Sequence, residues 1–251
     1  MFDGIIACGD SFTKYHLTAD GDMWPNILSR HYDIPYANLA RGGSSNYEIA
    51  LQPLQYTPNN IKEFRKPLII FGMTTPWRLP ILYPMQGMIG SIDSILPEHL
   101  RYRKDTGVDE QMLNKTIKKM IVNDLFHTLD TQALEKMMNW KKLIPNSTVI
   151  WGTIHFQHSL PNGGVNKMGV TTERDRILGL HHHLINSNYI EESYCFNEII
   201  DWFPLGHMLK GNPDLHINTD DHSKRIDHHP NEKGIQVIAD CLIKYIDSKF
   251  G

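Results

Sequence analysis

Residues 5–12 read Ile-Ile-Ala-Cys-Gly-Asp-Ser-Phe, and this stretch decides the fold. The apolar run from Ile5 to Cys8 stops abruptly at Gly9-Asp10-Ser11, a pattern typical of a buried strand that ends in a tight turn. In open α/β sheets, ligands bind outside the carboxyl ends of the strands, so Ser11 is placed where chemistry usually occurs. Gly, Asp and Ser are also common turn formers, so a turn without chemistry is the alternative interpretation.

Further apolar runs bounded by turn residues alternate with helical periodicity. The predicted strands that follow the first comprise residues 34–39, 67–71, 147–154 and 195–203. The predicted helices comprise residues 22–32 with Asp22 as the cap, a helix from about residue 46 capped by Ser44 or Ser45, residues 109–140, and a helix after residue 234. This alternation predicts one α/β domain over residues 1–251, with a parallel sheet flanked by helices. Pro and Gly interrupt the pattern at about residues 79–109, which we interpret as an irregular insertion.

The bulk composition excludes several classes of protein. The chain has 251 residues, of which 41% are hydrophobic and 21% charged, an ordinary globular balance. A net charge of -3 argues against a nucleic-acid or anionic-membrane surface, which normally has clustered Lys and Arg. Without an apolar run near 18 residues or a signal peptide, a cytoplasmic protein is expected. Cys8, Cys195 and Cys241 are far apart, so we expect free thiols in a reducing compartment.

Chemistry-bearing residues follow three of the predicted strands. Ser11 follows the first, Gly42-Gly43 the second and Thr74 the third, and the carboxyl ends of parallel strands meet at one edge of a sheet. The segment His228-His229-Pro230 precedes the last helix and can bring a base to the same edge. A serine nucleophile needs such a base, a carboxylate that fixes the base's tautomer, and donors for an oxyanion.

This set of motifs resembles the SGNH or GDSL-type hydrolase superfamily. The matching blocks are Gly9-Asp10-Ser11-Phe12, Asn38-Leu39-Ala40-Arg41-Gly42-Gly43 and Asp227-His228-His229-Pro230-Asn231, which occur in the family's order. The resemblance implies a flavodoxin-like α/β/α sandwich of three layers with a parallel sheet of about five strands. It also implies that the protein needs no metal or organic cofactor.

Each block implies roles for particular residues. By resemblance, Ser11 is the nucleophile, His229 is the general base and Asp227 orients His229. The backbone amides of Ser11 and Gly43 are the implied oxyanion donors. We prefer His229 to His228 because Pro230 follows it directly, which suits a residue held extended just before a helix.

Two departures from the family's pattern affect these assignments. The family's third block supplies an Asn two residues after a Gly, where this chain has Thr74 after Gly72. A Thr hydroxyl can donate one hydrogen bond, so we expect Thr74 to replace the Asn in the oxyanion hole. Losing that donor altogether would cost about 2.7–4 kcal/mol of transition-state stabilisation. The acid often lies three residues before the His, where this chain has Ile226, so Asp220 and Asp221 are alternatives to Asp227.

Three residues are candidates for substrate binding. Trp77 and Arg78 follow the third strand, and Arg78 is suited to anchor a carboxylate or a sugar hydroxyl, with a surface ion pair as the alternative. Asn46 is a candidate for substrate contact, although a role at the start of a helix is favoured. A metal site is not expected, because the consecutive histidines His181-His182-His183 point in different directions on a helix and no carboxylate-rich ligand set accompanies them or His155 and His158.

The expected function is a serine esterase that removes short, acetyl-like acyl groups from a carbohydrate or a small ester. Acyl transfer to an acceptor other than water would use the same residues. The rival interpretation is a binding or structural module that keeps the fold without turnover, since the chain also resembles SGNH-like proteins encoded by bacteriophages. For the protein itself, the expected partner is a small ester or an acylated carbohydrate substrate, rather than nucleic acid or membrane.

Overall fold

The computed structural model describes residues 2–14, 22–55, 64–74, 80–82, 89–91, 125–154, 194–196 and 229–251. Its centre is a five-stranded parallel sheet in the order β2-β1-β3-β6-β7. The strands are β1 (Gly4–Cys8), β2 (Tyr36–Asn38), β3 (Pro67–Met73), β6 (Thr148–Thr153) and β7 (Tyr194–Cys195). The expected α/β fold with a parallel sheet of about five strands is therefore confirmed.

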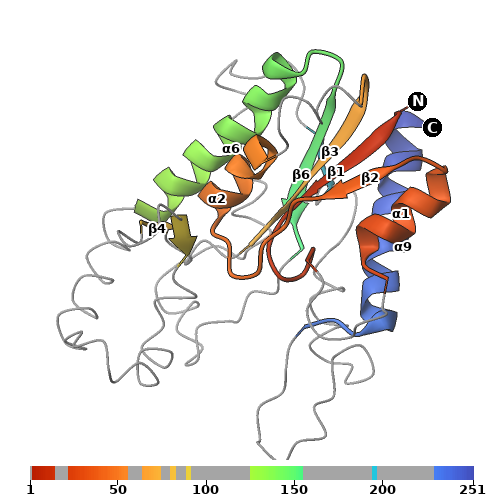
Figure 1. Ribbon diagram of the computed structural model, residues 1–251, viewed down its shortest axis with the longest axis horizontal. Helices are drawn as coiled ribbons and strands as arrows, with labels where there is room; N and C mark the ends of the chain where they lie inside the picture. The colour runs from red at the N-terminus through yellow and green to blue at the C-terminus, as the bar shows by residue number, and fades with distance from the viewer. Residues whose placement is uncertain are drawn as a thin grey trace, which may run out of the picture.

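Helices cover both faces of this sheet, which makes three layers (Figure 1). On one face lie α1 (Trp24–Tyr32) and α9 (Glu232–Phe250). On the other face lie α2 (Asn46–Leu51) and α6 (Leu125–Leu143), and a short 3-10 helix η1 (Gln52–Gln55) continues α2. The two chain termini lie close together at one end of the molecule (Figure 1).

The central strands β1 and β3 are buried at every position, and their alternate side chains belong to opposite layers. In β1, Ile5 packs in the cluster under α1 and α9, whereas Ile6 packs in the cluster under α2 and α6. The paired residues of β3, Leu68 and Ile69, divide in the same way. Continuous apolar sequence in β1 and β3 follows from this arrangement, because neither face of these strands meets water.

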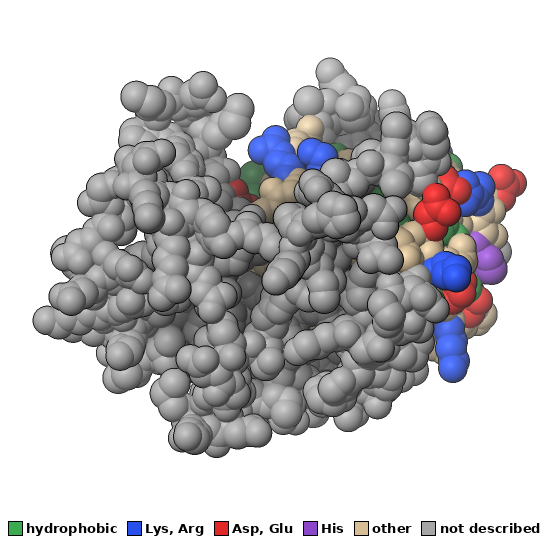
Figure 2. Space-filling model, turned by 90° about the horizontal axis from the view of Figure 1, so that it is seen from below, with side chains coloured by type: hydrophobic (Ala, Val, Ile, Leu, Met, Phe, Trp, Pro, Cys, Tyr) green, Lys and Arg blue, Asp and Glu red, His purple; other side chains and the backbone are tan. Residues whose placement is uncertain are grey.

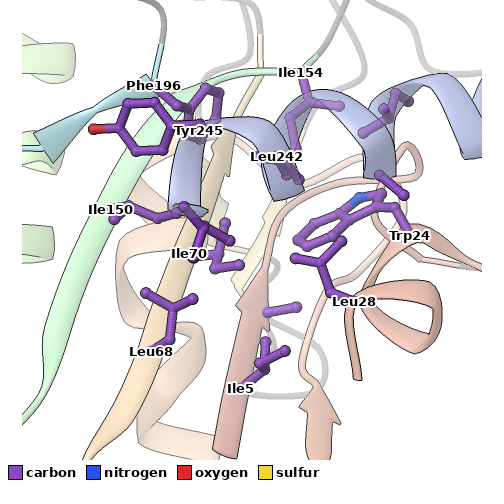
Figure 3. Close-up of a cluster of buried hydrophobic side chains, with 14 of the residues drawn as sticks. Ile5, Trp24, Leu28, Leu68, Ile70, Ile150, Ile154, Phe196, Leu242 and Tyr245 are labelled. Carbon is purple, nitrogen blue, oxygen red and sulfur yellow. The ribbon is translucent and has the colours of Figure 1, made fainter. Parts of the chain in front are cut away.

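The C-terminal helix α9 is attached to the sheet by an apolar stripe. Leu242 and Tyr245 project from α9 toward Ile70 and Ile150 of the sheet, and Trp24 of α1 lies in the same cluster (Figure 3). These five side chains are all fully buried. Because α9 begins directly after the His-Pro segment, its packing fixes where residue 229 enters the structure.

Two helix starts test the predicted caps. Ser45 caps α2 with a capping box: its side chain accepts from the Glu48 amide, and the Glu48 carboxylate accepts from the Ser45 amide. Of the two expected caps, Ser45 is thus the correct one. The prediction for Asp22 was wrong, because Met23 is the N-cap of α1 and Asp22 instead forms an ion pair with Arg30.

The predicted insertion at 79–109 is described only in part. It contains β4 (Pro80–Leu82) and β5 (Ile89–Ser91), which pair antiparallel. The irregular insertion therefore stays a prediction, within which the described residues form this short ribbon. The rest of 79–109, like residues 109–124 of the predicted long helix, lies outside the described residues.

The cysteines, the helices and the surface charges of the described residues can be compared with what the composition predicts. Cys8, Cys195 and Cys241 are free thiols, as expected. None of the helices in the described part of the chain is long and apolar enough to cross a bilayer. On the face seen in Figure 2, the described acidic and basic side chains are interspersed.

Candidate active site

Ser11 lies in the turn that follows β1, and Asp10 organises this turn. The Asp10 carboxylate accepts from the Phe12 amide at 2.9 Å, and the Asp10 carbonyl accepts from the amides of Thr13 and Lys14. The side chain of Asp10 is only 1% exposed and Ser11 only 7% exposed. The turn therefore holds the serine hydroxyl at the end of a buried strand rather than on an open surface loop.

His229 reaches this turn from the other end of the chain. Its Nε2 lies 2.8 Å from Ser11 Oγ, which is hydrogen-bond distance. Pro230 follows His229, and Asn231 then caps α9 by accepting from the Gly234 amide. The ring of Phe12 packs against the His229 ring with centroids 5.2 Å apart. The imidazole is thus held by its covalent neighbours and by a buried aromatic ring.

The loop after β2 packs against the same turn. Asn38 donates to the Thr13 carbonyl at 2.8 Å, and the Arg41 amide donates to the Gly9 carbonyl at 3.1 Å. A bond from the Ser44 amide to the Arg41 carbonyl closes a tight turn, in which Gly43 has a φ of 78°. That φ suits the third position of a type II turn, which strongly favours Gly.

Two backbone amides, those of Ser11 and Gly43, lie in the turns at this edge of the sheet. A methyl group placed on Gly42 would lie 3.8 Å from Ser11 Cβ, so the loop after β2 adjoins the turn that holds Ser11. Among the described residues, neither the Ser11 amide nor the Gly43 amide has a hydrogen-bond acceptor. Unpaired amides beside a serine hydroxyl are what an oxyanion hole requires.

Gln52 is a residue of this region that the sequence analysis did not single out. Its side-chain oxygen accepts from the Gly9 amide at 2.7 Å, and its side-chain nitrogen donates to the Gly9 carbonyl at 2.8 Å. The same nitrogen lies 3.3 Å from Ser44 Oγ. The Gln52 side chain therefore connects the end of β1 to the loop after β2 through hydrogen bonds to both. Its position in η1, 43 residues away in sequence, has no local signal that would have identified it.

Thr74 does not occupy the role predicted for it. Its hydroxyl donates to Asp10 Oδ2 at 2.8 Å, and its side chain is fully buried. A hydroxyl has one proton, so a bond to Asp10 leaves none for an oxyanion. A Thr74 hydroxyl bonded in this way is not available as an oxyanion donor.

Asn46 is likewise not placed to contact substrate. It is the first residue of α2 and only 4% exposed. Its side-chain nitrogen donates to the Thr74 carbonyl at 3.1 Å and to Asp130 Oδ1 at 2.8 Å, and its oxygen accepts from the Thr74 amide at 2.8 Å. Both polar ends of the side chain are engaged within the protein, so the expected helix-start position is correct and the tentative substrate role is not.

Several predicted site residues lie outside the described residues. They are Trp77, Arg78, Asp220, Asp221, Asp227, His228 and the histidines at 155, 158 and 181–183. The described residues thus bring together Ser11 and His229, and the turn that contains Gly43 adjoins them through Gly42. Burial raises the pKa of the nearby Cys8 thiol well above its ordinary value, which keeps that thiol protonated and a poor nucleophile.

Comparisons with known proteins support the fold. No protein-family model matches the chain, and no curated protein matches it. Among solved structures, the chain is similar to phospholipase A1 from Streptomyces albidoflavus, with 12% identity, a TM-score of 0.51 and coverage of 98% of this chain and 100% of that one. It is also similar to a mutant of an acetyl-xylooligosaccharide esterase from Geobacillus, with 11% identity, a TM-score of 0.50 and coverage of 97% and 94%. A Lactobacillus plantarum protein matches with 14% identity, a TM-score of 0.51 and coverage of 100% and 99%.

Proposed function

We propose, on the premise that this chain has the fold of the SGNH or GDSL-type hydrolases, that it is a serine hydrolase acting on carboxylic esters. The observation that carries the proposal is the 2.8 Å distance between Ser11 Oγ and His229 Nε2. A nucleophile and its base must lie within about 2.6–3.2 Å of each other for proton transfer. A turn without chemistry has no need of this pair, which joins opposite ends of the chain.

The reaction follows the logic of acyl transfer through a covalent intermediate. With the proton of the imidazole on Nδ1, Nε2 takes the proton of Ser11 as Oγ attacks the ester carbonyl. The resulting imidazolium of His229 returns this proton to the departing alcohol, which leaves an acyl group on Ser11. Water then attacks the acyl-enzyme, with His229 taking its proton and passing it back to Ser11 Oγ. The products are a carboxylic acid and an alcohol.

The amides of Ser11 and Gly43 are proposed as donors to the negative oxygen of each tetrahedral intermediate. Their support is that they lie on adjoining turns at the edge of the sheet and that neither has an acceptor among the described residues. Removing one oxyanion donor typically lowers kcat by about 100- to 1,000-fold. With two such donors among the described residues, where the family has three, we expect weaker stabilisation of the oxyanion than in a site with the family's Asn.

Asp227 is proposed as the acid that orients His229, with Asp220 and Asp221 as alternatives. The acid would accept from Nδ1–H and hold the tautomer in which Nε2 is the base. Exchange of each to Asn distinguishes them, because only one of the variants Asp227→Asn, Asp220→Asn and Asp221→Asn should lose activity by about four orders of magnitude.

The proposed substrate carries a short acyl group, such as acetyl, on a carbohydrate or another small alcohol. The support is analogy with the similar acetyl-xylooligosaccharide esterase, since a fold alone does not set a substrate. A series of p-nitrophenyl esters from acetate to octanoate, followed by release of acetate from acetylated xylooligosaccharides, tests both parts of this proposal.

The test of activity compares variants of the two central residues with a matched control. Ser11→Ala and His229→Gln should each lower kcat/KM for p-nitrophenyl acetate by at least about 1,000-fold. His31→Gln, which alters an exposed histidine of α1, should retain the activity of the unmodified protein. Equal residual rates in all of these proteins would place the hydrolysis elsewhere and refute the proposal.

A non-catalytic binding module is the second candidate. The observation that favours it is the bond between the Thr74 hydroxyl and Asp10, because it removes the one side-chain donor expected in the family's third block. A module of this kind would bind acylated saccharides without releasing acid. Calorimetric binding without turnover, unaffected by Ser11→Ala, would favour it over the hydrolase.

A further inference from the structure

A buried chain of hydrogen bonds connects α6 to the nucleophile turn. Asp130 of α6 accepts from Asn46, Asn46 accepts from the Thr74 amide, and the Thr74 hydroxyl donates to Asp10. Asp10 in turn accepts from the Phe12 amide, the residue directly after Ser11. The chain thus begins in one layer of the sandwich and ends in the turn that holds Ser11.

The polarity of these bonds fixes the orientation of the Asn46 amide. Its nitrogen faces two acceptors, the Thr74 carbonyl and Asp130 Oδ1, and its oxygen faces a donor, the Thr74 amide. If the amide were turned over, its oxygen would face both acceptors and its nitrogen would face the donor. Asn46 can therefore satisfy its surroundings in one orientation only, and it holds both the N–H and the C=O of Thr74.

Burial makes this arrangement rigid. Asn46, Thr74, Asp10 and Asp130 are all at most 4% exposed, so water does not replace a bond that is lost. A buried polar group left without a partner costs about 1–3 kcal/mol, more if it is charged. The Thr74 peptide consequently has one favoured position, and its hydroxyl is aimed at Asp10.

We propose that Asn46 is a positioning residue for Ser11, anchored by Asp130 and acting through Thr74 and Asp10. Its amide fixes Thr74, the Thr74 hydroxyl fixes the Asp10 carboxylate, and that carboxylate fixes the turn from which Ser11 Oγ meets His229. The proposal rests on the proposed function of Ser11. It also gives Thr74 a role that needs its hydroxyl, although that hydroxyl does not touch the substrate.

The first test measures how fast a small fluorophosphonate labels Ser11. Asn46→Ala should slow labelling by about 10- to 100-fold, because small displacements of a nucleophile carry penalties of this size. Thr74→Val should slow it similarly, and Thr74→Ser, which keeps the hydroxyl, should restore most of the rate. In the Asn46→Ala/Thr74→Val double variant, the slowing should be well below the product of the single effects, since both act along one path.

Trp140→Phe is the matched control. Trp140 of α6 donates to the Ala50 carbonyl of α2 at 2.9 Å, so its exchange removes a buried bond from the same interface without touching Thr74. It should lower the melting temperature yet leave the labelling rate within about twofold of the unmodified protein. If Asn46→Ala labels at the unmodified rate, or if Trp140→Phe slows labelling equally, Asn46 is merely structural and the proposal is overturned.

A second measurement is independent of catalysis. Hydrogen exchange of the Phe12 amide, which donates to Asp10, reports on the turn itself. Asn46→Ala should accelerate this exchange at least about tenfold relative to Trp140→Phe, whether or not Ser11 reacts. If the unmodified protein takes no label, the proposed hydrolase function fails, and the Phe12 exchange alone decides the positioning role: acceleration supports it and equal rates overturn it.

Discussion

Replacing Gln52 by Leu removes the clamp on Gly9 while keeping the size of the side chain. Gln52 is 1% exposed and makes bonds of 2.7 Å and 2.8 Å with the amide and carbonyl of Gly9. In the variant, the Gly9 carbonyl keeps the Arg41 amide as a donor, but the Gly9 amide loses its acceptor. The variant therefore leaves one buried donor unpaired.

The expected loss of stability follows from these contacts. An orphaned buried donor costs about 1–3 kcal/mol, and the net contribution of the second lost bond is about 0.5–1.5 kcal/mol. Gln52→Leu should therefore lower the free energy of unfolding by about 1.5–4.5 kcal/mol. For a chain of this size, each kcal/mol corresponds to a melting temperature lower by about 2–4 °C.

Urea unfolding followed by circular dichroism measures this loss, with an unchanged m-value as the condition for comparing midpoints. Gln236→Leu is the matched control, because Gln236 bonds Asp240 at 2.7 Å on the exposed side of α9. Its effect should stay within about 0.5 kcal/mol. Equal free energies of unfolding for the two Leu variants would refute the argument that Gln52 holds the end of β1.

Other predictions concern a turn, an ionisable group and a helix cap. Gly43→Ala should cost about 1–2 kcal/mol, because its φ of 78° is unfavourable for a residue with a side chain, and urea midpoints should show a smaller loss for Gly42→Ala. Burial and the bond to Asp247 raise the pKa of Tyr32, so the unfolded chain loses this proton first and stability falls as the pH rises above about 10. Tyr32→Phe should make that fall shallower when urea midpoints are compared at pH 8 and 10.5; an unchanged slope would contradict the assignment. Ser45→Ala should lower stability by about 1 kcal/mol through loss of the capping box, and no change in the urea midpoint would count against that bond's role.

The fold was predictable because it depends on local patterns. The run from Ile5 to Cys8 and the run in β3 are apolar at every position, as strands covered on both faces must be. Ser45 was predictable as a cap because its partner Glu48 is three residues away. The same rule predicts Asp22 as a cap and is wrong there, because the Asp22 carboxylate pairs with Arg30, two turns further along α1, and not with the amides at the start of the helix.

The buried hydrogen bonds that hold the site in place were not predictable, because the residues that they join are distant in sequence. Gln52 bonds a residue 43 positions away, and the bond between Asn46 and Asp130 spans 84 positions. No spacing rule connects such pairs before the sheet order is known. The place of Thr74 in a motif predicts that its hydroxyl donates to the oxyanion. In the structure, that hydroxyl instead donates its one hydrogen bond to the Asp10 carboxylate.

Intact-mass analysis after exposure to a small fluorophosphonate tests the central claim, that Ser11 is a nucleophile activated by His229. We expect one adduct per chain, found on the peptide that contains Ser11 and absent from Ser11→Ala. Labelling of His229→Gln should be slower by at least about 1,000-fold. No adduct at any pH at which the imidazole is neutral, or an adduct that persists in Ser11→Ala, would show that Ser11 is not a nucleophile activated by His229.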